Sequence, residues 1–132
     1  VSDKTHYNEM NVLSMHALIG AYQPQGYEWV DELNQVLAGN IEYFCNYVDE
    51  HFEGVSYSRP QGTYMVFLDC TEWCREHGRD IQWLLDEGAR VGVGYQDGRP
   101  FHGPCHIRVN LALPLSRVKE ACERLDRYVF GV

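Results

Sequence analysis

The chain has little positive charge and no long hydrophobic run. Its 132 residues include 11 lysines and arginines against 19 aspartates and glutamates, a formal net charge of -8. A protein that follows a phosphate backbone or an anionic membrane needs a basic surface, so this balance argues against both partners. No run approaches the roughly 18 apolar residues of a membrane span, and the N-terminus lacks the layout of a secretory signal. The sequence therefore predicts a cytoplasmic protein.

Cysteine is present in an odd number and at irregular spacing. The 5 cysteines are Cys45, Cys70, Cys74, Cys105 and Cys122. This pattern does not suit a secreted disulfide framework, so we expect reduced and mostly buried thiols. Cys70 and Cys74 would share a helix face without the geometry of a reliable disulfide, and we assign no function to their spacing.

The chain does have enough apolar material for one domain. It is 45% hydrophobic and 13% aromatic, and it shows neither an internal repeat nor a low-complexity segment. The polar opening segment, residues 1–11, has no clear pattern, and the first residue is valine rather than methionine. We therefore expect a piece of a longer protein.

Hydrophobic spacing predicts two helices in the first part of the chain. Residues 11–22 carry apolar side chains near helical spacing, and Pro24-Gln25-Gly26 is predicted to break that helix. From Tyr27 the apolar positions recur at steps of three and four, which predicts a helix of about 25 residues. That length exceeds what a compact domain of this size needs. Gly39-Asn40 in the middle therefore predicts either a bend in the helix or the point where the helix passes from one domain to another. Gly54 is expected to end this element.

The second part of the chain is predicted to mix strands and helices. Residues 63–69 are apolar on both faces, which is typical of a central strand covered on each side. Residues 70–78 are expected to form a connector. The other predicted elements are strands at 55–59, 91–94 and 106–114 and helices at 80–88 and 116–129.

Capping residues and glycines mark the limits of these elements. Asp80 and Ser116 are predicted N-caps, and Gly88 is predicted to end the helix that Asp80 begins. Gly92 and Gly94 would let another group approach one face of their strand closely. The element order predicts an α/β (α+β) two-layer sandwich, in which a small, mostly antiparallel or mixed sheet packs with helices and follows a long helix.

The predicted strand at 106–114 carries a cation. Because side chains alternate along a strand, Arg108, Asn110 and Ala112 share one face. A guanidinium on a rigid strand, beside an amide and a small residue, suits bidentate binding of a carboxylate or phosphate. The alternative is an exposed arginine on an edge strand. The opposite face carries the apolar residues Ile107, Val109, Leu111 and Leu113.

Separated segments of the chain resemble the C-terminal part of fold type I pyridoxal-phosphate enzymes. The similarity is to the class I/II aminotransferase superfamily, on the branch that includes cystathionine β-lyases. It extends from Gly26-Tyr27-Glu28-Trp29 through Gly39-Asn40 to Arg124-Leu125 and covers nearly the whole chain. Its main motifs, in order, are Pro60-Gln61-Gly62-Thr63-Tyr64, Gly98-Arg99-Pro100-Phe101 and Arg108-Val109-Asn110-Leu111-Ala112.

This resemblance implies a domain layout and a role for Arg108. Residues 1–25 would be the end of a large cofactor domain with its connector, and residues 26–132 the small domain, with the long helix as the link. Arg108 would bind the α-carboxylate of an amino-acid substrate in a homodimeric aminotransferase or C–S β-lyase. Asn110 would orient that guanidinium or be solvated, and Phe101 would line the substrate cleft or pin its loop.

The same resemblance implies a Schiff-base lysine that the chain does not provide. Its only lysines are Lys4 and Lys119. Lys4 lies in an unpatterned stretch without the family's Ser-x-x-Lys context, and Lys119 occupies an outward helix position. Pyridoxal phosphate chemistry needs such an amine, so the cofactor and its ligands are expected upstream, in a large domain of the same chain. This chain alone is expected to bind no cofactor and to be inactive.

Other residues of the chain allow alternative interpretations. A free-standing regulatory module could use Arg108 to bind a carboxylate, and an interaction domain could use the apolar strip from Val12 to Ile19. His102, Cys105 and His106 are zinc-ligand types, but a fourth ligand is not apparent and no metal is predicted. Gly92-Val93-Gly94 lacks the third glycine of a dinucleotide fingerprint, so no nucleotide site is predicted.

Overall fold

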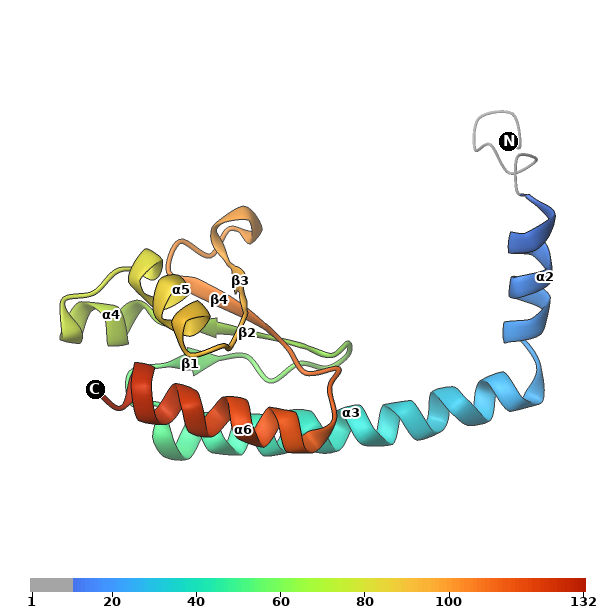
Figure 1. Ribbon diagram of the computed structural model, residues 1–132, viewed down its shortest axis with the longest axis horizontal. Helices are drawn as coiled ribbons and strands as arrows, with labels where there is room; N and C mark the ends of the chain where they lie inside the picture. The colour runs from blue at the N-terminus through green and yellow to red at the C-terminus, as the bar shows by residue number, and fades with distance from the viewer. Residues whose placement is uncertain (1–10) are drawn as a thin grey trace. The chain divides into compact units, whose positions relative to one another are not determined.

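The computed structural model describes residues 11–132 (Figure 1). The chain divides into two compact units, and the boundary falls between Val36 and Leu37. The domain limits expected from the resemblance, 1–25 and 26–132, stay a prediction. No helix in this part of the chain is long and apolar enough to span a membrane.

The first unit contains helix α2 (Val12–Ala21), which confirms the helix predicted at 11–22. Asn11 caps it, because the Asn11 side chain accepts a hydrogen bond from the Ser14 N–H at 2.9 Å. No side chain of α2 is buried among the described residues. The break predicted at Pro24 is confirmed, because α2 ends at Ala21, but Pro24 itself is helical. It begins the next helix, because a first-turn residue needs no N–H and proline already has a helical φ.

Helix α3 (Pro24–His51) is 28 residues long, starts in the first unit and ends in the second. It continues without a break through Gly39 and Asn40 and stops at His51, three residues before the predicted end at Gly54. Burial begins only at Asn40. The buried residues of α3 are Asn40, Phe44, Cys45 and Val48. The passage between domains that was predicted at Gly39-Asn40 therefore lies close to the point where α3 enters the hydrophobic core.

The second unit is built on a four-stranded sheet with the order β1-β2-β4-β3 and antiparallel pairing throughout (Figure 1). Strand β2 pairs with β4 over its whole length, and Phe67 lies opposite Arg108. The predicted two-layer fold with an antiparallel sheet is confirmed. The strands are β1 (Ser56–Tyr57), β2 (Met65–Asp69), β3 (Gln96–Asp97) and β4 (His106–Asn110).

One face of this sheet packs into a single hydrophobic core. Val66 and Leu68 from β2 alternate with half-exposed neighbours, as Ile107 and Val109 do on β4. The predicted alternation of β4 is confirmed for three of its apolar residues, since Leu111 is also buried, but Leu113 is 48% exposed because β4 ends at Asn110. Helices α5 (Ile81–Arg90) and α6 (Leu115–Leu125) contribute Ile81, Leu84, Val118, Cys122 and Leu125 to the same core.

A helix replaces the connector that was expected at 70–78. Helix α4 (Thr71–His77) ends at Gly78, which adopts the left-handed conformation with φ 61. Only Trp73 and Cys74 of this helix are buried. These two buried residues are adjacent in a helix of 7 residues, so they show no repeat at the helical period, which explains why the hydrophobic spacing did not predict α4.

The close approach predicted at Gly92 and Gly94 is found at Gly92, where a Cβ would lie 3.0 Å from the Arg124 guanidinium, and a second one occurs at Gly88. A Cβ at Gly88 would overlap the ring of Tyr95, whereas a Cβ at Gly94 would meet no atom within 4 Å. Gly88 therefore lies inside α5, which continues to Arg90, and does not end it. The predicted strand at 91–94 is wrong, because these residues form a turn with Gly92 at φ 75.

The predicted N-caps have different outcomes. Asp80 caps α5 by accepting a hydrogen bond from the Trp83 N–H at 2.8 Å. Ser116 does not cap α6, since the helix starts one residue earlier, at Leu115. Pro114 takes the cap position, and its carbonyl oxygen accepts from the N–H groups of Arg117 and Val118. A turn of π-helix, Asp126–Phe130, follows α6.

Candidate functional site

Arg108 lies in the middle of β4, on the face opposite the core. Its strand neighbours are Phe67 on β2 and Gln96 on β3. The alternative of an edge-strand arginine is therefore wrong, because β4 is paired on both sides. The side chain is half-buried, and its Cζ lies 4.5 Å from the centre of the Phe101 ring. At this distance the guanidinium rests on the aromatic face and is attracted to it.

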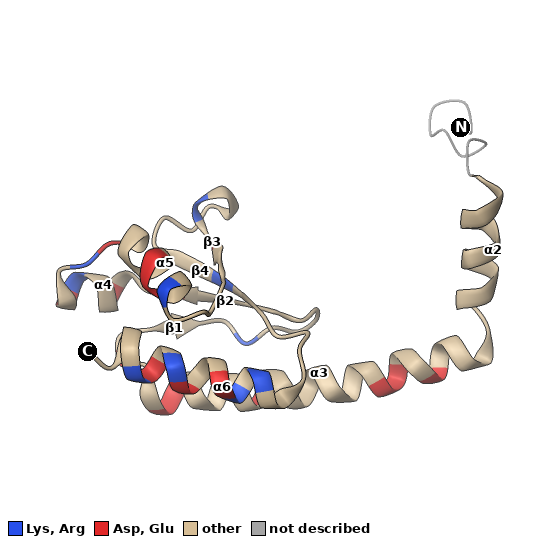
Figure 2. Cartoon of the chain, viewed as in Figure 1, with Lys and Arg blue, Asp and Glu red and all other residues tan. Residues whose placement is uncertain are grey.

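The guanidinium of Arg108 differs from most others in its pairing. Within residues 11–132, no hydrogen bond or ion pair engages it, so its donors are open to a ligand. Figure 2 shows basic and acidic positions side by side on α6, where Arg117 and Arg124 both pair with Glu120. The arginines that pair with carboxylates are Arg75, Arg90, Arg99, Arg117 and Arg124.

Phe101 reaches Arg108 because its loop folds back on the sheet. Phe101 ends the short 3-10 helix η2 (Arg99–Phe101) and is 46% exposed. The Gly98 N–H donates to the carbonyl oxygen of His106 at 2.8 Å, and the Gly103 N–H donates to that of Gly98 at 3.1 Å. A Cβ at Gly103 would overlap Phe67 and His106. Glycine at this position thus permits the approach that puts Phe101 on Arg108.

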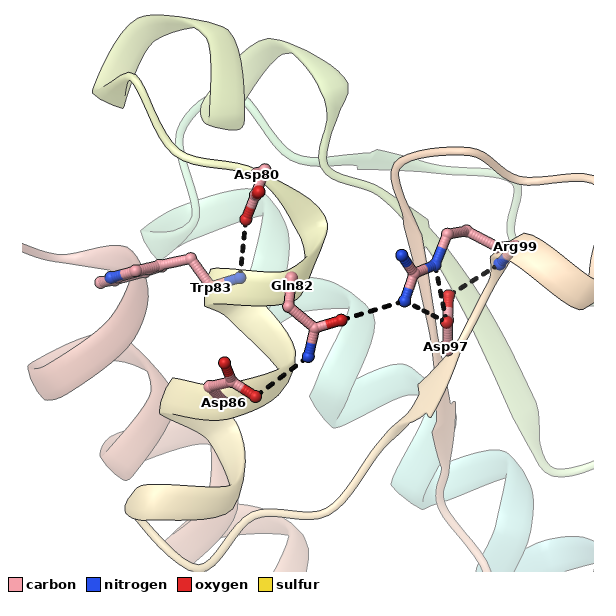
Figure 3. A network of polar contacts seen from close by, with 6 residues as sticks. All are labelled: Asp80, Gln82, Trp83, Asp86, Asp97 and Arg99. Carbon is pink, nitrogen blue, oxygen red and sulfur yellow. Dashed lines mark hydrogen bonds and ion pairs between the residues drawn. The ribbon is translucent and has the colours of Figure 1, made fainter.

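A polar network holds the start of η2 (Figure 3). The Arg99 Nε donates to Asp97 Oδ2 at 2.7 Å, and the Arg99 backbone N–H donates to Asp97 Oδ1 at 2.9 Å. A third bond crosses to α5, where Gln82 Oε1 accepts from Arg99 at 3.2 Å. The hydrogen bonds from the Arg99 side chain and backbone hold the pKa of Asp97 below its ordinary value.

Asn110 shares the face of Arg108 but is engaged elsewhere. Its Oδ1 accepts a hydrogen bond from the Ala112 N–H at 2.8 Å. Asn110 also lines a cavity of about 360 Å³ between the end of β4 and α6, and Arg108 is absent from the described lining of that cavity. The structure therefore brings Phe101 and Arg108 together and leaves Asn110 apart from their contact.

An acid and a histidine lie further along the same face. Asp69 Oδ2 is 3.7 Å from His106 Nε2, and the His106 ring lies 4.7 Å from that of Phe67. Burial opposes ionisation of Asp69, but hydrogen bonds from Thr71 and the charge of His106 outweigh it and lower its pKa. Among the described residues, His102, Cys105 and His106 included, the structure brings no three His, Cys, Asp or Glu side chains together in a group that could hold a metal ion.

The buried amide of Asn40 is a positioning residue that the sequence analysis missed. Its Nδ2 donates to the carbonyl oxygens of Leu111 at 2.9 Å and Leu113 at 2.7 Å, and the residue is 1% exposed. These bonds fix the chain directly after β4. The signal was present in the sequence, because Asn40 falls on the apolar face of its helix between Leu37 and Phe44.

Neither lysine of the chain is seen in contact with Arg108. Lys119 is exposed on α6, and its Nζ lies 5.2 Å from the centre of the Tyr43 ring. Lys4 lies outside the described residues. In residues 11–132, therefore, the only lysine is Lys119, and its ammonium group contacts Tyr43 and not Arg108.

Sequence comparison finds relatives that are named as cystathionine beta-lyases and as an aminotransferase. The chain is 34% identical over 118 residues to the Mycobacterium leprae protein named "Putative cystathionine beta-lyase", which covers 77% of the chain and 28% of that protein. The chain resembles one part of these enzymes. It is also 29% identical over 122 residues to an aspartate aminotransferase of Bacillus sp. strain YM-2, which covers 88% of the chain and 30% of the relative. No protein-family profile matches the chain.

Solved structures of the same enzyme classes share the fold. A PLP-bound C–S lyase from Staphylococcus hominis matches with a TM-score of 0.77 and 22% identity, over 88% of this chain and 30% of the enzyme. Cystalysin from Treponema denticola, which contains pyridoxal 5'-phosphate, matches with a TM-score of 0.69 and 23% identity, over 81% of this chain and 27% of its own. The resemblance predicted from the motifs is confirmed. The chain spans about 30% of the length of the relatives it matches.

Proposed function

We propose that this chain is the substrate-carboxylate-binding part of a pyridoxal-phosphate-dependent aminotransferase or C–S β-lyase that acts on an amino acid. Arg108 binds the α-carboxylate through its guanidinium. Phe101 supports the guanidinium from one side, and the amide nitrogen of Asn110 is a second donor on the same face. The rest of the intact enzyme, a large cofactor domain of the same chain in a homodimer, completes the site.

The observation that carries this proposal is the state of the Arg108 guanidinium. It is held on a strand paired on both sides, it rests on the Phe101 ring, and no carboxylate of the described residues neutralises it. A fixed guanidinium with open donors matches the two oxygens of a carboxylate. The relatives, which are named as amino-acid enzymes, support an amino acid as the source of that carboxylate.

The chemistry of the cofactor is assigned to the rest of the enzyme. Bound pyridoxal phosphate supplies an electron sink for the amino acid. The described residues hold no amine near Arg108, since Lys119 lies on α6 against Tyr43. The contribution of this chain is therefore to bind and orient the substrate.

We expect Arg108→Ala in the full-length enzyme to raise the KM for the amino acid about 100-fold, because charge-assisted hydrogen bonds of this kind contribute 1.5 to 3 kcal/mol each. Steady-state kinetics measures this, and visible absorbance checks that the cofactor still binds. Arg117→Ala, which removes an exposed arginine paired with Glu120, is the matched control.

Two outcomes would contradict the proposal. An unchanged KM in Arg108→Ala would remove this residue from the site. Tight binding of free carboxylates by the 132-residue chain alone, lost in Arg108→Ala and without any enzyme activity in the full-length protein, would favour a free-standing regulatory module.

A further inference from the structure

We infer that Gln82 and Arg99 are positioning residues for carboxylate binding, because they fix Phe101 on the guanidinium of Arg108. This inference rests on the proposed function and deepens it. Neither side chain touches Arg108. Both act through η2, whose first residue is Arg99 and whose last residue is Phe101.

Arg108 needs support from another element. An arginine side chain loses about 2 kcal/mol of rotamer entropy when it is fixed, so a clamp that is already oriented binds its ligand better than a mobile one. Asn110 does not give this support, since its Oδ1 accepts from the Ala112 N–H. The contact that Arg108 makes is with the ring of Phe101, 4.5 Å away.

Phe101 is itself held through its backbone more than through its side chain. The ring is 46% exposed, so packing restrains it little. The Phe101 N–H donates to the carbonyl oxygen of Gly98 at 2.9 Å, and the His102 N–H donates to that of Arg99 at 3.2 Å. The position of the ring therefore follows the position of η2.

Arg99 ties η2 to a different element of the fold. Its guanidinium bonds Asp97 on β3 and Gln82 on α5, so it links the loop to two separate supports (Figure 3). A second hydrogen bond orients the Gln82 amide group, because its Nε2 donates to Asp86 Oδ1 at 3.0 Å. Its Oε1 is thereby turned toward Arg99.

Loss of this anchor should lower the fraction of molecules that are ready to bind. When only a fraction of a protein is competent, its apparent dissociation constant rises by the inverse of that fraction. Without the side-chain bonds of Arg99, η2 keeps only its backbone bonds, such as the one from Gly98 to His106, so it holds the Phe101 ring over Arg108 less firmly. The effect falls on binding and not on the later chemistry, which other residues perform.

The test is a set of kinetic measurements on the full-length enzyme. We expect Gln82→Ala and Arg99→Ala each to raise the KM for the amino acid about twofold to fivefold, the range of an exposed polar pair, with kcat unchanged. Arg90→Ala is the matched control, because Arg90 pairs with Glu87 on the same helix α5. It should leave both constants unchanged.

A double-mutant cycle separates positioning from a general structural effect. If Gln82 acts through Phe101, then Gln82→Ala should change nothing further in a Phe101→Ala background. An equal rise of KM in both backgrounds would overturn the inference. A normal KM in Gln82→Ala and Arg99→Ala, with a raised KM in Arg108→Ala, would also overturn it and leave the proposed function intact. A normal KM in Arg108→Ala would refute the proposed function itself.

Discussion

Asn40 shows how one polar side chain in a core can set the position of a site. It is buried on α3, and both of its amide hydrogens are used by the carbonyl oxygens of Leu111 and Leu113. Those carbonyls follow Arg108 by a few residues, beyond the end of the β4 ladder. The Leu111 N–H still donates to the carbonyl oxygen of Tyr64, and the Asn40 amide supplies the donor for the carbonyl oxygens that the ladder leaves over.

We expect Asn40→Leu to lower the free energy of unfolding by about 2 to 3 kcal/mol, because it leaves two carbonyl oxygens without their donor. Chemical denaturation followed by circular dichroism measures the change. Asn46→Leu is the matched control on the same helix, since Asn46 is exposed, and its effect should stay within about 0.5 kcal/mol. Equal effects of the two substitutions would contradict the role assigned to Asn40.

At the same scale, the sequence predicted the face of Arg108 but not its contact. Strand alternation places Arg108 opposite Ile107 and Val109, and the structure agrees. The contact with Phe101 depends on the close approach of Gly103 to Phe67, which no spacing rule contains. Asn110 bonds its own backbone two residues on, a local competition that is common for asparagine.

The loop that carries Phe101 ends on a residue in an unfavourable conformation. His102 adopts φ 63 as the C-cap of η2, in the left-handed region that favours glycine. The side chain is exposed, so no packing compensates for the strain. The left-handed turn is nevertheless needed, because it lets Gly103 donate to Gly98 and close the loop.

We expect His102→Gly to stabilise the protein by about 0.5 to 1 kcal/mol. The left-handed conformation costs a residue with a Cβ about 1 to 2 kcal/mol, and glycine avoids this cost. Part of the gain is lost because glycine raises the conformational entropy of the unfolded chain. Thermal unfolding measures the shift. His102→Ala is the control, because it removes the imidazole and keeps the Cβ. A rise in melting temperature for both variants would show that the imidazole, and not the backbone, is the cause.

Elements with a repeated pattern were predicted, and those held by tertiary contacts were not. The long helix and the central strands repeat apolar residues at the helical and strand periods, and they are present. Helix α4 shows no repeat and depends on Trp73 in the core. The strand expected at 91–94 lies instead at Gln96–Asp97. The preceding residue, Tyr95, packs its ring directly against Gly88 of α5.

On the scale of the whole molecule, burial is confined to one of the two units. Every side chain that is buried in the described chain lies between Asn40 and Phe130. The first unit shows apolar side chains to solvent instead, among them Val12 at 66% and Leu13 at 82%. Contiguous exposed apolar surface marks interaction sites, and the apolar strip from Val12 to Ile19 stays a predicted contact surface.

We therefore expect residues 37–132 to fold without residues 1–36. The shortened chain should unfold cooperatively, at a melting temperature within a few degrees of that of the full chain, because its core is complete. Circular dichroism during heating measures this, with the 132-residue chain as the reference. A shortened chain without a cooperative transition would show that the first unit is part of the folding core.

The stacking of Arg108 on Phe101 gives the site its own spectroscopic signal. Protons held above an aromatic ring experience its ring current, so the guanidinium resonances of Arg108 are shifted away from those of the solvated arginines. Arg79 over Trp83 and Arg127 over Tyr128 are shifted in the same way, and Arg108→Ala assigns the signal of the site. A ligand that alters the stacking would change that shift, and binding can then be followed by nuclear magnetic resonance on the natural residues, without a label on the ligand.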